Sequence, residues 1–477
     1  MNRSEQASAP ESRPARLPVV PSRRDFLRTS GAATIMLGAG STFLSACAGA
    51  TGVGGGKSGG KKTIKILLWS HFVPRYDKWF DAWAQKWGQA NDVTVVVDHI
   101  DQADLPPRTA SEFAAGAGHD LIEWITPPSA YEPSVLDMSD VVKEAEGKYG
   151  PQISFCKQSS YNPTTNKYYG FCHTWTPDPG DYRKQLWTKV GFPNGPATYD
   201  DLLKGGAEIK SKLNVRMGIG MSAEVDSNMA ARALIWSYGG SVQDAQENVV
   251  LNSPQVIDAV TYMGQLYKQA MTNEIFSWTA ASNNQGLVAG QLSYILNSIS
   301  AYRSAQTTNK ATANDIFFVP ALKGPGGTGL ASEHVIRSYI VPKWAKNVDK
   351  IKKFLLDLVG AAHDSAYNSE LYDFPAFSNT SAASALPGWL ASDPFGSQPS
   401  NKLELLASAQ QWSTNVGHPG PSNAAIGEIF TTNVLPTMMA DVAQGKSTPK
   451  EAVASAAKQC EAIFSKWRAK GLVGGHA

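Results

Sequence analysis

Short apolar runs alternate with amphipathic segments over residues 63–126, and this alternation constrains the fold more than any other feature of the sequence. The runs at 63–69, 93–97 and 121–126 have the length and composition of buried strands. The segment after the first run and the segment at 105–116 predict helices. A repeat of strand, helix, strand, helix and strand is typical of a parallel sheet with right-handed crossovers.

The first predicted helix carries a set of aromatic residues at spacings of three and four. They are Tyr76, Trp79, Phe80, Trp83 and Trp87. This spacing places the rings on one face of a helix. We expect that face to pack in the core rather than to bind a ligand.

Two loops follow the carboxyl ends of predicted strands. They are residues 70–72 and 124–131, and they carry hydroxyl groups, an imidazole and aromatic rings. Ligands of parallel α/β sheets collect beyond the carboxyl ends of the strands. We therefore expect these loops to contribute to a binding site.

Residues 22–47 have the three-part layout of an export signal. Arg23 and Arg24 lead into an apolar run at 31–43, which closes on Leu-Ser-Ala-Cys at 44–47. The paired arginines resemble a twin-arginine signal, and the last four residues resemble a bacterial lipobox. An apolar run of about 15 residues is too short to span a membrane, which needs about 20.

This layout predicts the organisation of the N-terminal part of the chain. We expect residues 1–46 to be a twin-arginine lipoprotein signal peptide and Cys47 to be lipidated. Residues 47–62 are rich in glycine and predict a flexible tether. The folded part would then lie outside the cytoplasm, attached by its acyl chains to the outer face of the cytoplasmic membrane.

Length and charge limit what the rest of the chain can be. Removing the signal from the 477 residues leaves roughly 430, which is more than one hydrophobic core usually organises, so two lobes are expected. The signal also carries six arginines and three acids, so its removal changes the net charge from +2 to −1. No basic patch remains that would favour nucleic acid as a partner.

The chain has four cysteines, of which Cys47 is the lipidation site. Cys156 and Cys172 flank a turn region rich in Tyr, Asn and Pro, so they form a candidate disulfide pair in an oxidising compartment. The unbridged state remains an alternative. Cys460 lies on a predicted helix, and we expect it to be a buried free thiol.

Several weak motifs occur in a fixed order along the chain. They lie at 115–121, 169–172, 182–186, 196–202, 235–240, 289–298 and 443–452. Thr198 with Asp201, and Thr448 with Glu451, also form capping boxes that predict helix starts, and the serine and proline at 253–254 predict another. As an ordered set, these motifs resemble the family 1 extracellular solute-binding proteins of ABC importers, the group that includes maltose-binding proteins.

The resemblance implies an α/β, two-lobed periplasmic-binding-protein-like fold of type II, with a ligand cleft between lobes joined by hinge segments. We expect the first lobe at 63–172 plus 338–380 and the second at 173–337 plus 381–470. The implied function is a lipid-anchored receptor that delivers a carbohydrate, an oligosaccharide or a glycoside, to an ABC importer permease. The receptor would be a monomer without cofactor, metal or catalytic residues.

The resemblance also implies ligand-binding positions. They are Ser70, His71, Trp124, Thr126, Trp175, Asp226, Asn228, Trp278, Asn297, Ser300, Tyr302, His334, His418 and Asn423. Trp278 could equally belong to the core, whereas Trp236 is assigned to the core. The sequence departs from the family pattern near these positions, at Cys172, Ser298 and 176–181, which leaves the ligand open.

Other functions remain as alternatives. A secreted carbohydrate-active enzyme would need two carboxylates, for which Asp178 and Asp181 are the candidates. A non-transporting sensor, or a receptor for a non-sugar solute such as a polyamine or phosphate ester, would use the same fold. The glycine-rich segment 324–329 fits a dinucleotide-binding pattern, but no helix follows it, so we interpret it as a hairpin turn.

Overall fold

The computed structural model describes residues 62–476. The predictions for the signal peptide at 1–46, for lipidation of Cys47 and for the tether up to residue 61 lie outside the described residues. Lys62, which we placed in the tether, is instead the first residue of β1 (Lys62–Trp69).

A six-stranded sheet forms the first lobe. Its strands, in spatial order, are β12 (Phe374–Pro375), β6 (Phe171–Thr176), β11 (Val335–Ile340), β3 (Leu121–Trp124), β1 and β2 (Val93–Ile100). β1 pairs in parallel with both β2 and β3, which confirms the predicted parallel unit. β11, from much later in the chain, pairs antiparallel with β3 and β6.

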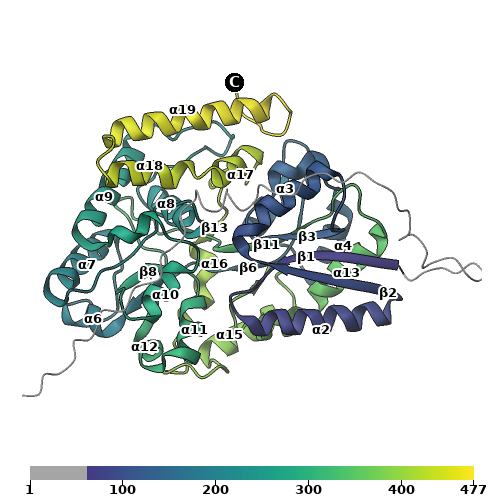
Figure 1. Ribbon diagram of the computed structural model, residues 1–477, viewed down its shortest axis with the longest axis horizontal. Coiled ribbons are helices and arrows are strands. Elements are labelled where there is room, and N and C mark those ends of the chain that lie inside the picture. The colour runs from purple at the N-terminus through teal and green to yellow at the C-terminus, as the bar shows by residue number, and fades with distance from the viewer. Residues whose placement is uncertain (1–61, 477) are drawn as a thin grey trace, which may run out of the picture. The chain divides into compact units, whose positions relative to one another are not determined.

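Helices cover both faces of this sheet, with α2 (Pro74–Ala90) on one side and α3 (Leu105–Ala115) on the other (Figure 1). Because side chains of a strand alternate between faces, Ile66 and Leu68 belong to the core beneath α2, whereas Leu67 packs with Leu105 of α3. The predicted aromatic face of α2 is confirmed as core. Phe80, Trp83 and Trp87 contact Phe354 of α13 (Val348–Gly360), with a centroid distance of 5.0 Å for Trp87.

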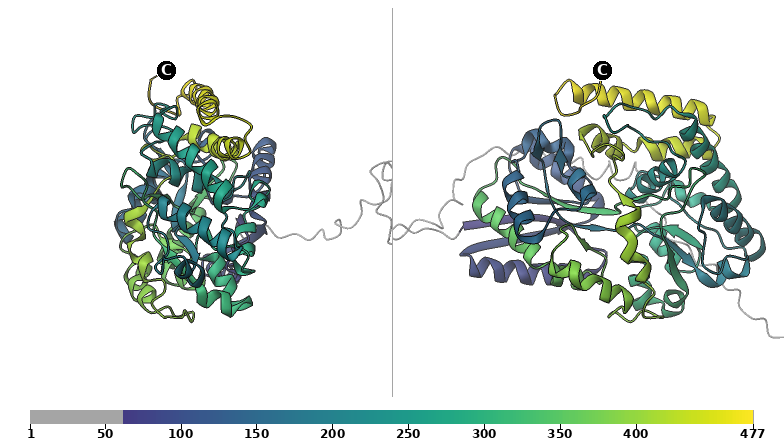
Figure 2. Two further views of the ribbon diagram at one scale, coloured as in Figure 1. Left: turned by 90° about the vertical axis from the view of Figure 1, so that its left-hand side faces the viewer. Right: turned by 180° about the vertical axis from the view of Figure 1, so that it is seen from behind.

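A smaller, three-stranded antiparallel sheet belongs to the second lobe. Its spatial order is β8 (Tyr294–Leu296), β7 (Gly180–Arg183) and β9 (Ile316–Val319). Tyr182, Tyr294 and Val319 of this sheet pack with a second hydrophobic core, which is built mainly from helices, whereas Ile295 and Phe318 pack with the first core. The helices of the second core are α7 (Tyr199–Leu213), α8 (Val225–Ser237), α9 (Pro254–Ala270), α17 (Ala424–Thr431), α18 (Val434–Ala443) and α19 (Pro449–Arg468). Helices α9, α18 and α19 pack against one another (Figures 1 and 2).

Short segments cross between the two sheets. The chain leaves β6 at Thr176 and enters β7 at Gly180, and it returns from β10 (Ala331–Ser332) to β11 through residues 333 and 334. β10 pairs in parallel with β13 (Ser413–Thr414). Two α/β lobes joined by such crossings confirm the predicted fold class.

The capping motifs in the sequence predicted three helix starts correctly. The capping boxes at Thr198 and Thr448 are both present, and the Ser253 side chain caps α9. The prediction for 324–329 is wrong in one respect, because β9 pairs with β7 and β10 pairs with β13, so the turn does not close a hairpin. Gly324 lies where a Cβ would overlap the carbonyl of Ser237, which explains glycine there.

The lobe bounds that we expected remain a proposal. Leu386, Leu390 and Leu406 pack with the first core although we placed 381–470 in the second lobe.

The other helical elements are η1 (Gln102–Asp104), η2 (Ser129–Ser134), α4 (Ser139–Tyr149), α5 (Ser154–Gln158), α6 (Lys184–Lys189), η3 (Asn273–Phe276), α10 (Ser282–Val288), α11 (Ser300–Thr308), α12 (Lys310–Asp315), α14 (Ala362–Asn368), α15 (Ser381–Ala391), η4 (Glu404–Ser408) and α16 (Ala409–Trp412). A small hairpin pairs β4 (Tyr161–Asn162) with β5 (Lys167–Tyr168). Within residues 62–476, no helix combines the length and apolarity needed to span a membrane.

Candidate ligand-binding site

A cavity of about 500 Å³ is lined by segments of both lobes. The first lobe contributes residues from 70–72, 101–106 and 124–126, and the second contributes residues from 223–228, 278–281 and 430–433. Its volume falls within the range of small-molecule sites, about 300–1,000 Å³. It is therefore our candidate binding site.

The first-lobe wall is formed where β1, β2 and β3 end. Because these strands are parallel neighbours, their carboxyl ends meet at one edge, as the sequence predicted. The Ser70 N–H donates to the Ile100 carbonyl at 2.7 Å, which ties the first two loops together. Trp124 is 3% exposed and packs on Tyr131, and its indole N–H has no hydrogen-bond partner within residues 62–476.

The second-lobe wall begins at the N-terminus of α8. Glu224 is the N-cap, and its carboxylate accepts the backbone N–H groups of Asp226 at 2.7 Å and Ser227 at 2.6 Å. One turn later, Asn228 donates to the Asn433 side chain at 2.8 Å, which joins α8 to the loop before α18.

Trp278 forms the adjacent part of this wall. Its ring lies against Gly218, where a Cβ would overlap the indole, so glycine is required for this position of the ring. The Ser222 hydroxyl donates to the Trp278 carbonyl at 2.8 Å and holds the backbone. Trp278 thus lines the cavity and is partly buried at the edge of both hydrophobic cores.

The cavity lining combines aromatic rings with hydroxyl and amide groups. The rings are those of Phe72, Trp124, Trp278 and Phe430. The polar groups include those of Ser70, Gln102, Thr126, Asn228, Thr279, Thr431 and Asn433. Asp101 and Glu224 are the acidic lining residues, and no lysine or arginine lines the cavity in the part of the chain that the structure describes.

Buried charged groups lie behind Glu224. Asn283 donates to Asp226 at 2.6 Å, and His334 lies 3.6 Å from Asp226 and 3.0 Å from Asp178. Burial and the neighbouring Glu224 raise the pKa of Asp226 well above its usual value, and burial raises the pKa of Glu224. Burial opposes protonation of His334, but Asp178 and Asp226 outweigh it and raise its pKa.

Five of the predicted ligand-binding residues line the cavity. They are Ser70, Trp124, Thr126, Asn228 and Trp278. The structure places the other nine elsewhere. Asp226 and His334 lie behind the wall in the charged group just described.

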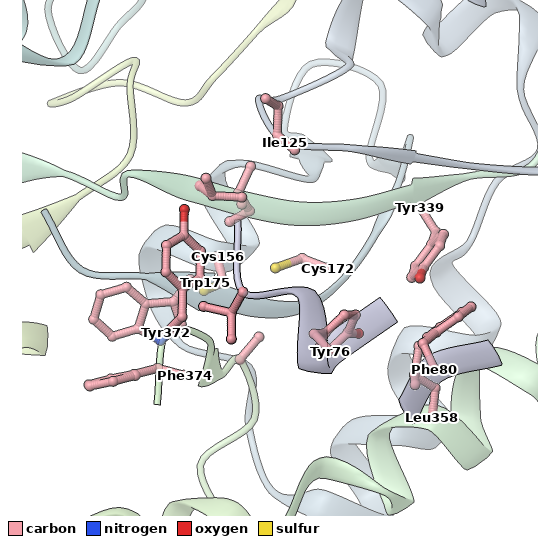
Figure 3. Close-up of a cluster of buried hydrophobic side chains, with 14 of the residues drawn as sticks. Tyr76, Phe80, Ile125, Cys156, Cys172, Trp175, Tyr339, Leu358, Tyr372 and Phe374 are labelled. Carbon is pink, nitrogen blue, oxygen red and sulfur yellow. The ribbon is translucent and has the colours of Figure 1, made fainter. Parts of the chain in front are cut away.

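Three more residues pack away from the cavity, two of them in the first lobe and one, His418, in the loop after β13. His71 is buried, stacks on Tyr76 and lies 3.3 Å from Asp373. Trp175 packs between Phe155 and Phe374 in the first core (Figure 3). His418 lies 3.1 Å from the Thr414 hydroxyl and packs on Trp236, which is buried as predicted.

The remaining four make structural hydrogen bonds. Asn297 donates to Asn284 and Ser300, and Ser300 lines an adjacent cavity with Phe72. The Tyr302 hydroxyl donates to Ser397 at 2.7 Å. Asn423 caps α17 and donates to Gln243 and Glu247, both at 2.8 Å. These side chains already have partners, which explains why polar residues occur there without lining the cavity.

Sequence reasoning missed several lining residues. Phe72 lies in the loop 70–72 that we expected to contribute, although it was not among the predicted ligand-binding residues. Gln102 follows β2 and could have been found from that strand end. Glu224 precedes a helix, but nothing local marks it as a cavity residue. Phe430 and Asn433 reach the site only through tertiary packing of α17 and α18, so the sequence carries no local signal for them.

The three cysteines within residues 62–476 lie in the hydrophobic cores. Cys156 and Cys172 are buried and unbridged in the structure, in the first core (Figure 3). Burial and the adjacent Cys172 thiol raise the pKa of Cys156 well above its usual value. The disulfide stays a prediction. Cys460 on α19 is a buried free thiol, as predicted.

The two carboxylates considered for an enzyme do not line the cavity. Asp178 pairs with His334, and Asp181 on β7 is fully buried. Burial and Asp178 raise the pKa of Asp181 well above its usual value. Within the described residues, no group of three or more His, Cys, Asp or Glu side chains could hold a metal ion.

Comparisons with solved structures match this architecture. Maltose-bound MalE3 of T. maritima has a TM-score of 0.69 at 17% identity, over 84% of this chain and 99% of that one. A sugar transporter protein of Arthrobacter chlorophenolicus A6 with bound laminaribiose has a TM-score of 0.70 at 15% identity, over 84% and 99%. The GacH receptor of Streptomyces glaucescens, solved unliganded and with acarbose, has a TM-score of 0.65 at 15% identity, over 85% and 99%.

Sequence comparisons identify the family. Binding proteins of Brucella abortus and Brucella suis are 30% identical over 88 residues, which span 18% of this chain and a fifth, 20%, of the length of those curated relatives. The family model described as bacterial extracellular solute-binding protein matches residues 73–356, which is more than half of the chain. The chain therefore belongs to the bacterial extracellular solute-binding proteins.

Proposed function

We propose that this protein is a receptor that captures a carbohydrate, an oligosaccharide or a glycoside, and delivers it to the permease of an ABC importer. One observation carries the proposal. The cavity between the lobes combines four aromatic rings with a set of hydroxyl and amide groups.

This lining suits the chemistry of a sugar. A pyranose ring presents apolar C–H faces, which pack on aromatic faces, and a rim of hydroxyl groups, which need hydrogen-bond partners. The hydroxyl groups of Ser70 and Thr126 line the cavity and offer donors and acceptors for sugar hydroxyls. A ligand that buries such a group without a hydrogen-bond partner loses about 1–3 kcal/mol of binding free energy, which makes the site selective.

The related structures support the same class of ligand. They are described as bound to maltose, laminaribiose and acarbose, which are all saccharides. Asp178 and Asp181, the carboxylates considered for glycoside cleavage, do not line the cavity. We therefore favour a receptor that binds its ligand unchanged over an enzyme that cleaves it.

The proposed location follows from the N-terminal sequence. We propose that residues 1–46 are removed on export, that Cys47 carries the lipid anchor and that the receptor acts as a monomer outside the cytoplasm. Mass spectrometry of the exported protein tests the anchor. A lipid-modified N-terminal cysteine is expected, and an unmodified Cys47 would contradict it.

Ligand screening tests the function. A ligand that binds only the folded protein raises its melting temperature, so a glycan library is screened by thermal shift and the hits are titrated by calorimetry. Trp124→Ala and Trp278→Ala are each expected to weaken binding at least tenfold, which corresponds to about 1.4 kcal/mol. Trp389→Ala is the matched control, because Trp389 packs on His363 and Tyr367 and does not line the cavity. A library without a single glycan hit, or unchanged affinity in both cavity variants, would contradict the proposal.

A further inference from the structure

We infer that Arg232 is a positioning residue for ligand binding, which fixes the hydrogen-bond polarity of Asn228 and Asn433 and the place of the Phe430 ring in the cavity wall. This inference rests on the proposed function and names a residue outside the cavity lining on which that function depends.

Arg232 differs from the other deeply buried arginines of the described chain. It lies on α8 and is 1% exposed. Arg303 and Arg337 are buried to a similar degree, and both form ion pairs with carboxylates. The hydrogen bonds of Arg232 within residues 62–476 go instead to uncharged oxygen atoms. Burial accordingly lowers the pKa of Arg232 to about 10, and it raises the pKa of the neighbouring Glu333 to about 8, so Glu333 supplies no full charge at neutral pH.

A buried cation without a carboxylate partner costs free energy of folding. We therefore expect Arg232 to serve the binding site rather than the stability of the protein, and its contacts fit this expectation.

Arg232 contacts two residues that line the cavity. Its Nη1 donates to the side-chain Oδ1 of Asn228 at 3.0 Å and to the Asn228 carbonyl at 3.1 Å. Its guanidinium group lies over the Phe430 ring, with 4.8 Å between Cζ and the ring centroid. Its Nε donates to the Val416 carbonyl at 3.0 Å, in the loop after β13. Because Asn228 belongs to α8 and Phe430 to α17, one side chain holds two helices of the cavity wall.

The chemistry of arginine determines which way the neighbouring amides point. A guanidinium group donates and cannot accept, so Asn228 turns its oxygen towards Arg232 and its NH2 group away. That NH2 group donates to the Asn433 oxygen at 2.8 Å and to the Glu224 carbonyl at 3.2 Å. The NH2 group of Asn433 in turn donates to the Thr431 carbonyl at 3.3 Å. Arg232 thus sets the direction of a chain of hydrogen bonds that ends in the cavity lining.

The ligand therefore meets a wall of defined polarity. Within residues 62–476, both amide hydrogens of Asn228 are used, whereas Asn433 keeps one amide hydrogen and one acceptor position. Asn433 is partly exposed and lines the cavity. A sugar hydroxyl both donates and accepts, so it pairs with Asn433 in one defined orientation. Without Arg232, either amide could turn about its terminal bond, and the wall would lose this preference.

Substitutions of Arg232 test the inference by calorimetric titration of the mature protein with maltose, cellobiose and laminaribiose. Arg232→Met removes the hydrogen bonds of the guanidinium group, and we expect it to weaken the tightest-binding disaccharide at least tenfold. Arg232→Lys keeps a group that only donates. Because one nitrogen of Arg232 makes both bonds to Asn228, we expect Arg232→Lys to retain affinity within threefold of wild type.

Arg468→Met is the matched control. Arg468 also donates to two carbonyl oxygens and lies over a phenylalanine ring, but it does not line the cavity or contact its lining residues. Its substitution should leave affinity unchanged. Should Arg232→Met fail to fold, Arg232→Gln takes its place, because a glutamine amide can donate or accept and no longer dictates the polarity.

A double-mutant cycle separates positioning from a general loss of stability. If Arg232 acts through the amide chain, the effect of Arg232→Met on affinity should be at least threefold smaller in an Asn433→Ala background. Residues that are not in contact usually act additively, so the effect should be unchanged in a Trp278→Ala background. A merely structural role would lower the melting temperature and would produce no difference between the two backgrounds.

The outcomes separate this inference from the proposed function. Affinity of Arg232→Met within threefold of wild type, an equal loss in Arg232→Lys, or equal effects in the two backgrounds would each overturn the inference while the carbohydrate receptor stands. If none of the three disaccharides binds, crystal structures of the wild type and of the Arg232 variant decide the inference. Unchanged placement of Asn228, Phe430 and Asn433 would overturn it and displaced side chains would support it, whereas the wider glycan screen decides the receptor function.

Discussion

Two regions of the molecule bury carboxylates, one beside an arginine and the other without a lysine or arginine partner in the part of the chain that the structure describes. In the first lobe, Arg337 on β11 donates to both oxygens of Glu123 and to Asp373, with all three N–O distances at 2.9 Å. Near the α8 N-terminus, Glu224 and Asp226 face a histidine but no lysine or arginine within the described residues.

The pKa values follow this difference. Burial alone would raise the pKa of Glu123 and Asp373. Arg337, together with His173 at Glu123 and with His71 and His173 at Asp373, outweighs burial, which lowers both pKa values and brings that of Asp373 to about 2. At Asp226 and Glu224, burial has a larger effect than the neighbouring histidine and hydrogen-bond donors, so the pKa values of both are raised. The compensated cluster lies within the first-lobe sheet, whereas the uncompensated pair lies at the cavity. Strongly shifted pKa values in a cleft are typical of functional sites, which is consistent with ligand binding at the second region.

The largest effect is expected when the compensated cluster is broken. Arg337→Met would leave Glu123 and Asp373 buried without a cation, and it should reduce the free energy of unfolding by about 3–5 kcal/mol. Denaturant unfolding measures the change. Lys353→Met is the control, because its ion pair with Asp357 is half exposed and contributes roughly 0.5 kcal/mol. A loss below about 1 kcal/mol for Arg337→Met would mean that the cluster is not what stabilises these carboxylates.

A second prediction uses pH to separate a buried carboxyl group whose pKa is raised, Glu333, from one whose pKa is lowered, Asp373. Glu333, at the crossing before β11, is fully buried, and burial raises its pKa to about 8. The folded protein holds this proton more tightly than the unfolded chain, so stability falls as the pH rises from about 4.5 to about 8. Glu333→Gln should therefore be more stable relative to wild type at pH 8 than at pH 5, by about 2 kcal/mol or more.

Asp373→Asn should show the opposite sign. The pKa of Asp373 is lowered, so its stabilising contribution is present above about 3.8 and is lost as the pH falls toward about 2. The variant should lose stability relative to wild type at pH 6 and much less at pH 2.5. Thermal melts across pH provide the measurement, and the same sign for both variants would refute the contrast.

The smallest effect concerns the cavity wall itself. Gly218→Ala would introduce a methyl group that overlaps the Trp278 ring, and moving the ring should weaken ligand binding by up to tenfold, which corresponds to about 1.4 kcal/mol. Titration with the best glycan measures it. Gly388→Ala is the control, because nothing lies near its Cβ position. Equal ligand affinity in the two variants would argue that Trp278 does not contact the ligand.

Local patterns predicted the elements of the fold accurately. The α2 aromatic face, the caps at Thr198 and Thr448 and the parallel order of β1, β2 and β3 depend on neighbouring residues, so the sequence carries them directly. The antiparallel β11 and its pairing with β6 depend on long-range contacts and were not predicted.

The site was predicted only in part, for a related reason. Ser70, Trp124 and Thr126 follow strand ends, where topology alone points to ligands. His71 and Trp175 are also polar or aromatic residues of the kind expected in such a site, but their side chains pack in the core. The sequence alone does not determine which way a side chain points. Phe430 and Asn433 come from a distant part of the chain, and only the packed structure brings them to the cavity.

A crystal structure of the protein with its tightest-binding glycan tests the central claim most directly. The account predicts the saccharide in the cavity between the lobes, with one sugar face on Trp124 or Trp278. A glycan bound elsewhere on the molecule, with this cavity empty, would contradict it.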